Sequence, residues 1–158
     1  MILAQAIQVE DLQHASLKEL RSIFEKLPAP DDDFRAGFFS AQFIGPWWIR
    51  LTARPSLHVT GLPHWQGKKF KTPELATNIL YSPQGLTEKY LMNCVHGPSM
   101  VDQQQAVYLD YGSQAPRPWR WIRDELRVLN EHSMLCMTVI DIPVLRHFPF
   151  PFVLSRKP

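Results

Sequence analysis

Residues 119–140 read WRWIRDELRVLNEHSMLCMTVI, and the way this stretch folds decides the class of the whole protein. As a helix, 119–129 would place Ile122, Leu126 and Leu129 on one face, and Pro118 suits the position before a helix. As strands, 119–129 and 134–140 would form a hairpin around the turn 130–132. Trp and Val favour a sheet, and the flanking segments also have strand patterns, so we predict the hairpin.

Outward from this hairpin, short strand patterns separated by turn residues run from Gly37 to Arg156. The clearest is 47–54, where Trp47, Ile49 and Leu51 alternate with largely polar positions at a period of two. Fourteen prolines disfavour long helices. We therefore predict an all-β fold, an antiparallel barrel of about nine to ten strands. The expected strands are 37–44, 47–54, 56–61, 66–71, 76–81, 87–95, 104–111, 119–129, 134–140 and 148–156.

One helix is expected before the strands. Ser16 and Glu19 have the spacing of a capping box, and an apolar stripe through Leu20 and Phe24 follows them. Pro28 ends the pattern. We expect a single domain over 1–158, with an N-terminal helix over 9–28 that docks on the sheet or plugs one end, and a barrel over 37–156.

The composition is that of a globular protein, with 45% hydrophobic and 20% charged residues. A net charge of +2 is too balanced to indicate nucleic acid or an anionic membrane as a partner. The N-terminus lacks the pattern of a signal peptide, and no stretch reaches the roughly 20 apolar residues of a membrane span. We expect a cytoplasmic protein whose Cys94 and Cys136 are reduced thiols.

No motif indicates a reaction or a cofactor. The segment 61–69 differs from a phosphate-binding loop in its glycine spacing, so we interpret Lys68 and Lys69 as exposed turn residues. Ser99 follows a proline and is not a nucleophile elbow. Cys94 and His96 would share a strand face, but a structural metal needs two more ligands. We predict neither a metal nor a cofactor.

Charged residues concentrate in 119–129. On a strand, Arg120 and Asp124 would share the mostly apolar face, where a charge needs a partner. Either these two residues lie near the open end of the strand, or they form a polar patch that orients a ligand head group. The opposite row, Arg123, Glu125 and Arg127, is interpreted as a solvated face.

A barrel of this size encloses more space than its side chains easily fill, so the abundant aromatic residues favour a lined pocket over a solid core. We expect this pocket to bind a small, largely apolar molecule, with a homodimer as a further expectation. The candidate ligand-binding residues are Trp47, Tyr90, Tyr108, Arg120, Asp124 and Met137.

Two family resemblances fit this fold. Gly45-Pro46-Trp47 is similar to the G-x-W motif that opens the first strand of lipocalins, and Arg156 resembles the last-strand basic residue that packs across that tryptophan in calycins. The alternative opening of the first strand is at Gly37, which would put Trp47 on the second strand. The resemblance implies a calycin/lipocalin-like barrel that holds a small apolar ligand at its mouth.

The segment 65–70 also resembles the bacterial GXWXG-type family of unknown function. Similarities to that family extend to 124–127, 134–137 and 152–156, whereas the G-x-W-x-G motif itself is absent, with Phe39 and Ala41 in its place. This resemblance implies the same lipocalin-like fold and no particular ligand.

Ligand binding without covalent chemistry is the first expected function. Fatty acids, lipid-derived metabolites, isoprenoids and tetrapyrroles are the expected ligand classes. One alternative is a general acid–base enzyme of the isomerase, cyclase or hydratase type, with Asp124, Glu125, Tyr108 and His96 as its first candidates. A carboxylate deep in the cavity beside a tyrosine would favour the enzyme. The other alternative is a filled barrel that binds a protein partner through an apolar strip from 143–152.

Overall fold

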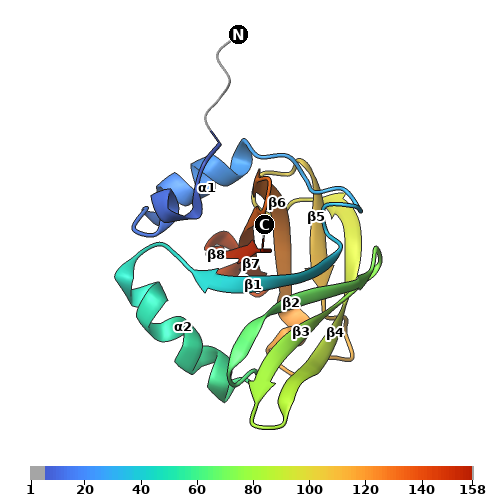
Figure 1. Cartoon of the computed structure of the whole chain (residues 1–158). Helices are drawn as coiled ribbons and strands as arrows, with labels where there is room; N and C mark the ends of the chain where they lie inside the picture. Colours follow the sequence, from blue (N-terminus) through green and yellow to red (C-terminus); the bar gives the residue numbers. More distant parts are fainter. Residues whose placement is uncertain (1–5, 158) are drawn as a thin grey trace.

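The computed structural model describes residues 6–157, and its centre is a closed antiparallel β-barrel (Figure 1). Each strand pairs with the next along the chain, and the last pairs with the first. The prediction of an all-β antiparallel barrel is therefore confirmed. The eight strands are β1 (Gly37–Phe43), β2 (Trp65–Thr72), β3 (Leu75–Ser82), β4 (Gly85–Pro98), β5 (Gln105–Asp110), β6 (Ile122–Asn130), β7 (Ser133–Ile140) and β8 (Phe150–Ser155).

Within residues 6–157, two α-helices accompany the barrel in place of the one expected, and both lie on the left in Figure 1. They are α1 (Leu17–Glu25) and α2 (Trp47–Val59). Short 3-10 turns occur at Val9–Leu12, Trp119–Trp121 and Leu145–His147. Within the described residues, no helix is long and apolar enough to span a membrane.

Helix α2 corrects the prediction of strands at 47–54 and 56–61. Gly45 has a positive φ of 96° and Pro46 is the N-cap residue, so the chain turns away from the sheet after β1. The pairs at 48–49, 52–53 and 56–57 recur every four residues, as on one face of a helix, and they line a cavity. Residues 47–54 also fit a period of two, so the pattern by itself is ambiguous.

The decisive stretch 119–140 folds as predicted, as a hairpin of β6 and β7, except that Trp119–Trp121 form a 3-10 turn. Ile122, Asp124 and Leu126 share the face that points into the barrel. The expectation that Asp124 lies on the apolar face is therefore confirmed, whereas Arg120 lies in the exposed turn before the strand.

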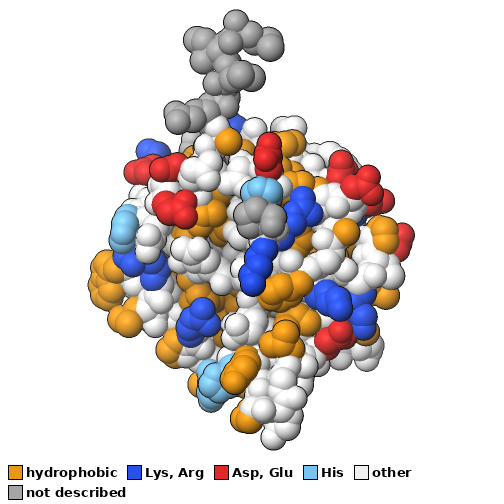
Figure 2. All heavy atoms as spheres, in the orientation of Figure 1, with side chains coloured by type: hydrophobic (Ala, Val, Ile, Leu, Met, Phe, Trp, Pro, Cys, Tyr) orange, Lys and Arg blue, Asp and Glu red, His pale blue; other side chains and the backbone are white. Residues whose placement is uncertain are grey.

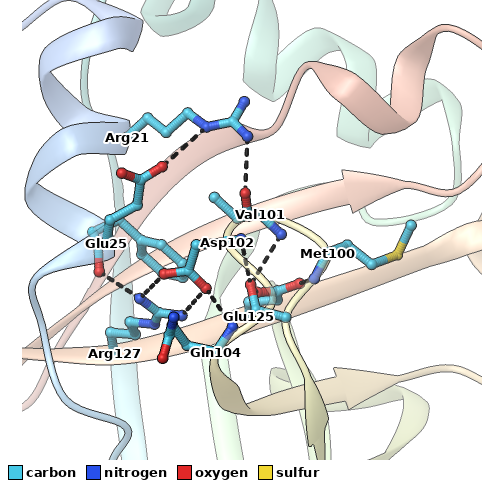
Figure 3. Close-up of polar contacts among 10 residues, drawn as sticks. Arg21, Glu25, Met100, Val101, Asp102, Gln104, Glu125 and Arg127 are labelled. Carbon is cyan, nitrogen blue, oxygen red and sulfur yellow. Dashed lines mark hydrogen bonds and ion pairs between the residues drawn. The ribbon is translucent and has the colours of Figure 1, made fainter.

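The predicted solvated row on the other face of β6 is wrong, because Glu125 and Arg127 are buried, with exposed fractions of 0% and 2%. Helix α1 and the loop 99–104 cover them (Figure 3). Arg127 donates to both carboxylate oxygens of Asp102, at 2.6 and 2.7 Å, and to the backbone carbonyl of Phe24, at 2.8 Å. These hydrogen bonds hold the pKa of the Asp102 carboxyl below its usual value.

Helix α1 docks on the outer face of the sheet, the first of the two placements expected from the sequence, and does not plug an end of the barrel. Its Ser16 cap accepts a hydrogen bond from the backbone N–H of Glu19 at 3.1 Å. Leu20 and Phe24 are fully buried against outward-facing residues of β7 and β8 such as Leu135. A second apolar core therefore lies between α1 and the barrel, separate from the interior core.

The two cysteines are free thiols, Cys94 on β4 and Cys136 on β7. These strands are not neighbours in the barrel, so the expectation of unpaired thiols is confirmed.

Candidate functional site

A cavity of about 330 Å³ lies at the end of the barrel where β1 ends and β2 begins, and α2 borders it. Its lining is dominated by apolar and aromatic side chains from α2 and from the adjoining ends of β1, β2, β6, β7 and β8. The lining residues that carry the argument below are Ala53, Leu57, Trp65, Trp119, Ile122 and Ile140. The opposite half of the interior is filled by residues such as Phe39, Phe70 and Met134.

A buried ion pair borders the apolar cavity. The Lys68 ammonium of β2 lies 2.9 Å from a carboxylate oxygen of Asp124 on β6, and these side chains are only 2% and 5% exposed. The other carboxylate oxygen of Asp124 accepts a hydrogen bond from the Thr138 hydroxyl at 2.7 Å. All three residues line the cavity, so it combines apolar walls with a compact polar patch.

Asn78 of β3 and Tyr111, just after β5, complete this polar patch. The carbonyl oxygen of Asn78 accepts from the Trp65 indole at 3.1 Å and from Lys68 at 2.9 Å. The Tyr111 hydroxyl lies 3.2 Å from Lys68 and 3.1 Å from the Asn78 amide nitrogen. We call Lys68, Asn78, Tyr111, Asp124 and Thr138 the polar cluster.

The polar cluster keeps Lys68 charged and Tyr111 neutral. Burial by itself lowers the pKa of Lys68, but Asp124 and Tyr111 raise it, and the net pKa is above the usual value for lysine. Burial raises the pKa of Tyr111, and Lys68 offsets only part of that increase. At neutral pH the cluster therefore holds one ammonium and one un-ionised phenol.

This arrangement predicts that the free energy of unfolding falls as pH rises above about 8.5, where thiols of the unfolded chain begin to ionise. Burial raises the pKa of Cys94 and Cys136, and Tyr111 and Lys68 also have raised pKa values. The folded protein keeps protons that the unfolded chain releases. The stability from these groups is complete below their unfolded pKa values and is lost at higher pH.

Urea unfolding between pH 7 and pH 11 tests this prediction. Cys136→Ala should show a shallower decline than the wild type between about pH 8.5 and pH 10, since alanine carries no titrating proton. A wild-type stability that stays constant or increases over this range would contradict the prediction.

The structure places the six candidate ligand-binding residues in different environments. Asp124 lines the cavity. Tyr90, a bulged residue of β4, packs against Tyr111 and Trp119 without being part of the lining. The remaining four lie away from the cavity. Trp47, at the start of α2, is 67% exposed, and Arg120 is exposed as well. Tyr108 lies under the Arg123 guanidinium, and Met137 is buried beneath α1.

Figure 2 shows the same view as Figure 1, with hydrophobic side chains at the surface on the left, where α2 begins. Trp47 and Leu51 are among the exposed hydrophobic residues of this helix. The side of α2 that carries them is therefore turned to solvent, while Ile49, Ala53 and Leu57 border the cavity.

Most of the polar cluster was missed by reasoning from sequence. The interpretation of Lys68 as an exposed turn residue is wrong, because a bulge next to Gly67 brings both Trp65 and Lys68 to the inner face of β2. Asn78 and Thr138 each occupy an apolar face of their strand, and Tyr111 continues the apolar face of β5 just beyond its end. The signal that identified Asp124, one polar residue on an apolar face, applies to all three.

The residues that carried the lipocalin resemblance have other roles here. Gly45-Pro46-Trp47 leads into α2 and does not open the first strand, which begins at Gly37. The guanidinium of Arg156 lies over the rings of Phe34 and Phe39, at 4.5 and 5.5 Å from their centroids. Its partners are therefore phenylalanines near β1 and not Trp47.

The fold and the cavity define a closed antiparallel barrel with a helix-bordered, mainly apolar pocket. No family model and no curated protein matches the chain significantly. A solved structure, described as the crystal structure of a protein from Thermomonospora curvata, is similar with a TM-score of 0.70. The match covers 92% of this chain and 90% of that one at 14% identity, so the similarity concerns the fold alone.

Proposed function

We propose that this protein binds a small, largely apolar molecule non-covalently in the barrel cavity. The observation that carries the proposal is a cavity of about 330 Å³ with mainly apolar walls. Among the described residues, the charged side chains that line it are Lys68 and Asp124, which pair with each other. Pockets of this size with few polar groups are typical of sites for small molecules. Fatty acids, lipid-derived metabolites, isoprenoids and tetrapyrroles are the ligand classes proposed.

The driving force would be the removal of apolar surface from water. Burying about 300 Å² of ligand surface against residues such as Trp65, Trp119 and Ile122 is worth roughly 7 kcal/mol before ordering costs. A net free energy of this size would correspond to affinities approaching the micromolar range, and the ordering costs weaken the affinity from that limit. Helix α2 would shield the bound molecule from solvent.

Filling the cavity tests the proposal. Ala53→Trp should lower the affinity for 1-decanol by about tenfold or more, because the indole would occupy space that the ligand needs. Leu51→Trp is the matched control, since Leu51 is on the same helix but 66% exposed. Isothermal titration calorimetry provides the measurement, and circular dichroism confirms that both variants are folded. Equal affinity in the two variants would contradict the proposed location.

One observation favours a second candidate function, general acid–base catalysis on the same scaffold. The carboxylate of Asp124 lies inside the barrel and shares Lys68 as a partner with the Tyr111 hydroxyl. A carboxylate and a neutral phenol at one pocket suit isomerisation, cyclisation or hydration. Of the residues first considered for this role, Tyr108 and Glu125 lie on the outer face, so Tyr111 takes the place of Tyr108.

Native mass spectrometry separates the two candidates. The protein is purified with its bound molecule, incubated, and its ligand is then identified again. An unchanged ligand mass and structure over time supports binding alone, and conversion that Asp124→Asn abolishes supports catalysis.

A further inference from the structure

The hydrogen-bond donors of Lys68 are fully used inside the protein. Its ammonium lies within 3.3 Å of four acceptor atoms, from Asn78, Met92, Tyr111 and Asp124. An ammonium has three N–H groups, so none remains for a ligand. Although Lys68 borders the cavity, it has no donor to offer a carboxylate or a phosphate.

The orientation of the Asn78 amide makes Tyr111 a donor. Both partners of the Asn78 carbonyl oxygen, the Trp65 indole N–H and the Lys68 ammonium, can only donate, which fixes the oxygen toward them. The Asn78 NH₂ group therefore faces Tyr111 and donates to its hydroxyl oxygen. Lys68 donates to the same oxygen. Among residues 6–157, no acceptor is found for the hydrogen of the Tyr111 hydroxyl itself.

Asp124 supplies the complementary acceptor. A carboxylate has about four acceptor positions, and Asp124 uses two of them, for Lys68 and Thr138. The charge of its carboxylate is balanced by Lys68, so the polar cluster is neutral overall. Tyr111 thus presents a spare donor to the cavity and Asp124 presents spare acceptor positions, without net charge on the polar cluster.

From this pairing we propose that the ligand is neutral and ends in a group that both accepts and donates a hydrogen bond, an alcohol or a carboxamide. Its oxygen would accept from Tyr111, and its O–H or N–H would donate to Asp124. A carboxylate could not donate to Asp124 and would add an unpaired negative charge to a buried site. This inference rests on the proposed function and narrows it, and it removes fatty acids in their ionised form from the ligand classes.

Three probes with one decyl chain test the inference: 1-decanol, 1-methoxydecane and decanoate. The alcohol can accept and donate, the ether can only accept, and the acid is ionised at neutral pH. We expect 1-decanol to bind at least about fivefold more tightly than either of the other probes. This ratio of dissociation constants corresponds to the net free energy of one hydrogen bond, about 1 kcal/mol. Tyr111→Phe should reduce the affinity for 1-decanol by a similar factor. Tyr108→Phe, which removes a hydroxyl from the outer face, should not.

The outcomes separate this inference from the proposed function. Tighter binding of 1-decanol by the wild type supports the inference, even if Tyr111→Phe fails to fold. Equal affinities for the three probes, or tightest binding of decanoate, overturn the inference and leave a binding cavity in place. Failure of all three probes to bind the folded wild type overturns both.

Discussion

Lys68→Met should lower the free energy of unfolding by about 3–5 kcal/mol, because it leaves the carboxylate of Asp124 buried without its ammonium partner. The side chains of the pair are 2% and 5% exposed, so hydration replaces little of the lost ion pair in the folded protein. Urea unfolding at pH 7 provides the measurement. Lys69→Met is the matched control on the same strand, where the side chain is exposed, and it should cost less than about 0.5 kcal/mol.

The double variant Lys68→Met/Asp124→Leu should recover much of the stability lost in the single variant. Replacing a buried ion pair by apolar residues of similar volume is often neutral or stabilising. Such a result would indicate that the ion pair contributes to the polar lining of the cavity and not to the stability of the fold. If Lys68→Met is as stable as Lys69→Met, the pair is not buried as the structure has it.

Gly67→Ala should be still more disruptive, with a loss of more than about 4 kcal/mol or no folded protein at all. A Cβ at this position would overlap the backbone carbonyl oxygen of Phe39, where β1 and β2 pair closely. Backbone cannot move aside there without opening the barrel between these strands, and the bulge that brings Lys68 inside would be lost as well.

Gly97→Ala is the matched control, since Gly97 also lies in a strand but a Cβ there would only touch the Tyr108 ring at 3.4 Å. Thermal unfolding followed by circular dichroism compares the two variants. Similar unfolding temperatures for Gly67→Ala and Gly97→Ala would show that β1 and β2 are not in this close contact.

Much of the barrel was predictable because its strands carry local signals. Turn residues and apolar runs located all eight observed strands, although they also predicted two strands, at 47–54 and 56–61, that are absent from the described residues. The capping pattern at Ser16 located α1. The segment that became α2 fits both periods over its first eight residues. As a helix, this segment turns one face toward the end of the barrel. That contact joins segments distant in sequence, so a local pattern does not reveal it.

The candidate site was less predictable for the same physical reason. Asp124 could be placed on the apolar face because β6 is regular from Ile122 to Val128, whereas Lys68 depends on a bulge that shifts the register of β2. The outward faces posed a further problem. Glu125 and Arg127 look like solvated residues in sequence, but the loop 99–104 and α1 cover them, and no local pattern indicates which outer face will be covered.

Occupancy of the cavity is the central claim, and methyl-detected NMR of the wild type titrated with 1-decanol tests it most directly. The account predicts saturable one-to-one shifts of the methyl groups of Leu57, Ile122 and Ile140, which line the cavity. The exposed methyl groups of Leu86 and Leu91 should stay unchanged. No shift of the cavity methyl groups up to the solubility limit, or shifts confined to the outer side of α2 at Leu51 and Val59, would contradict it.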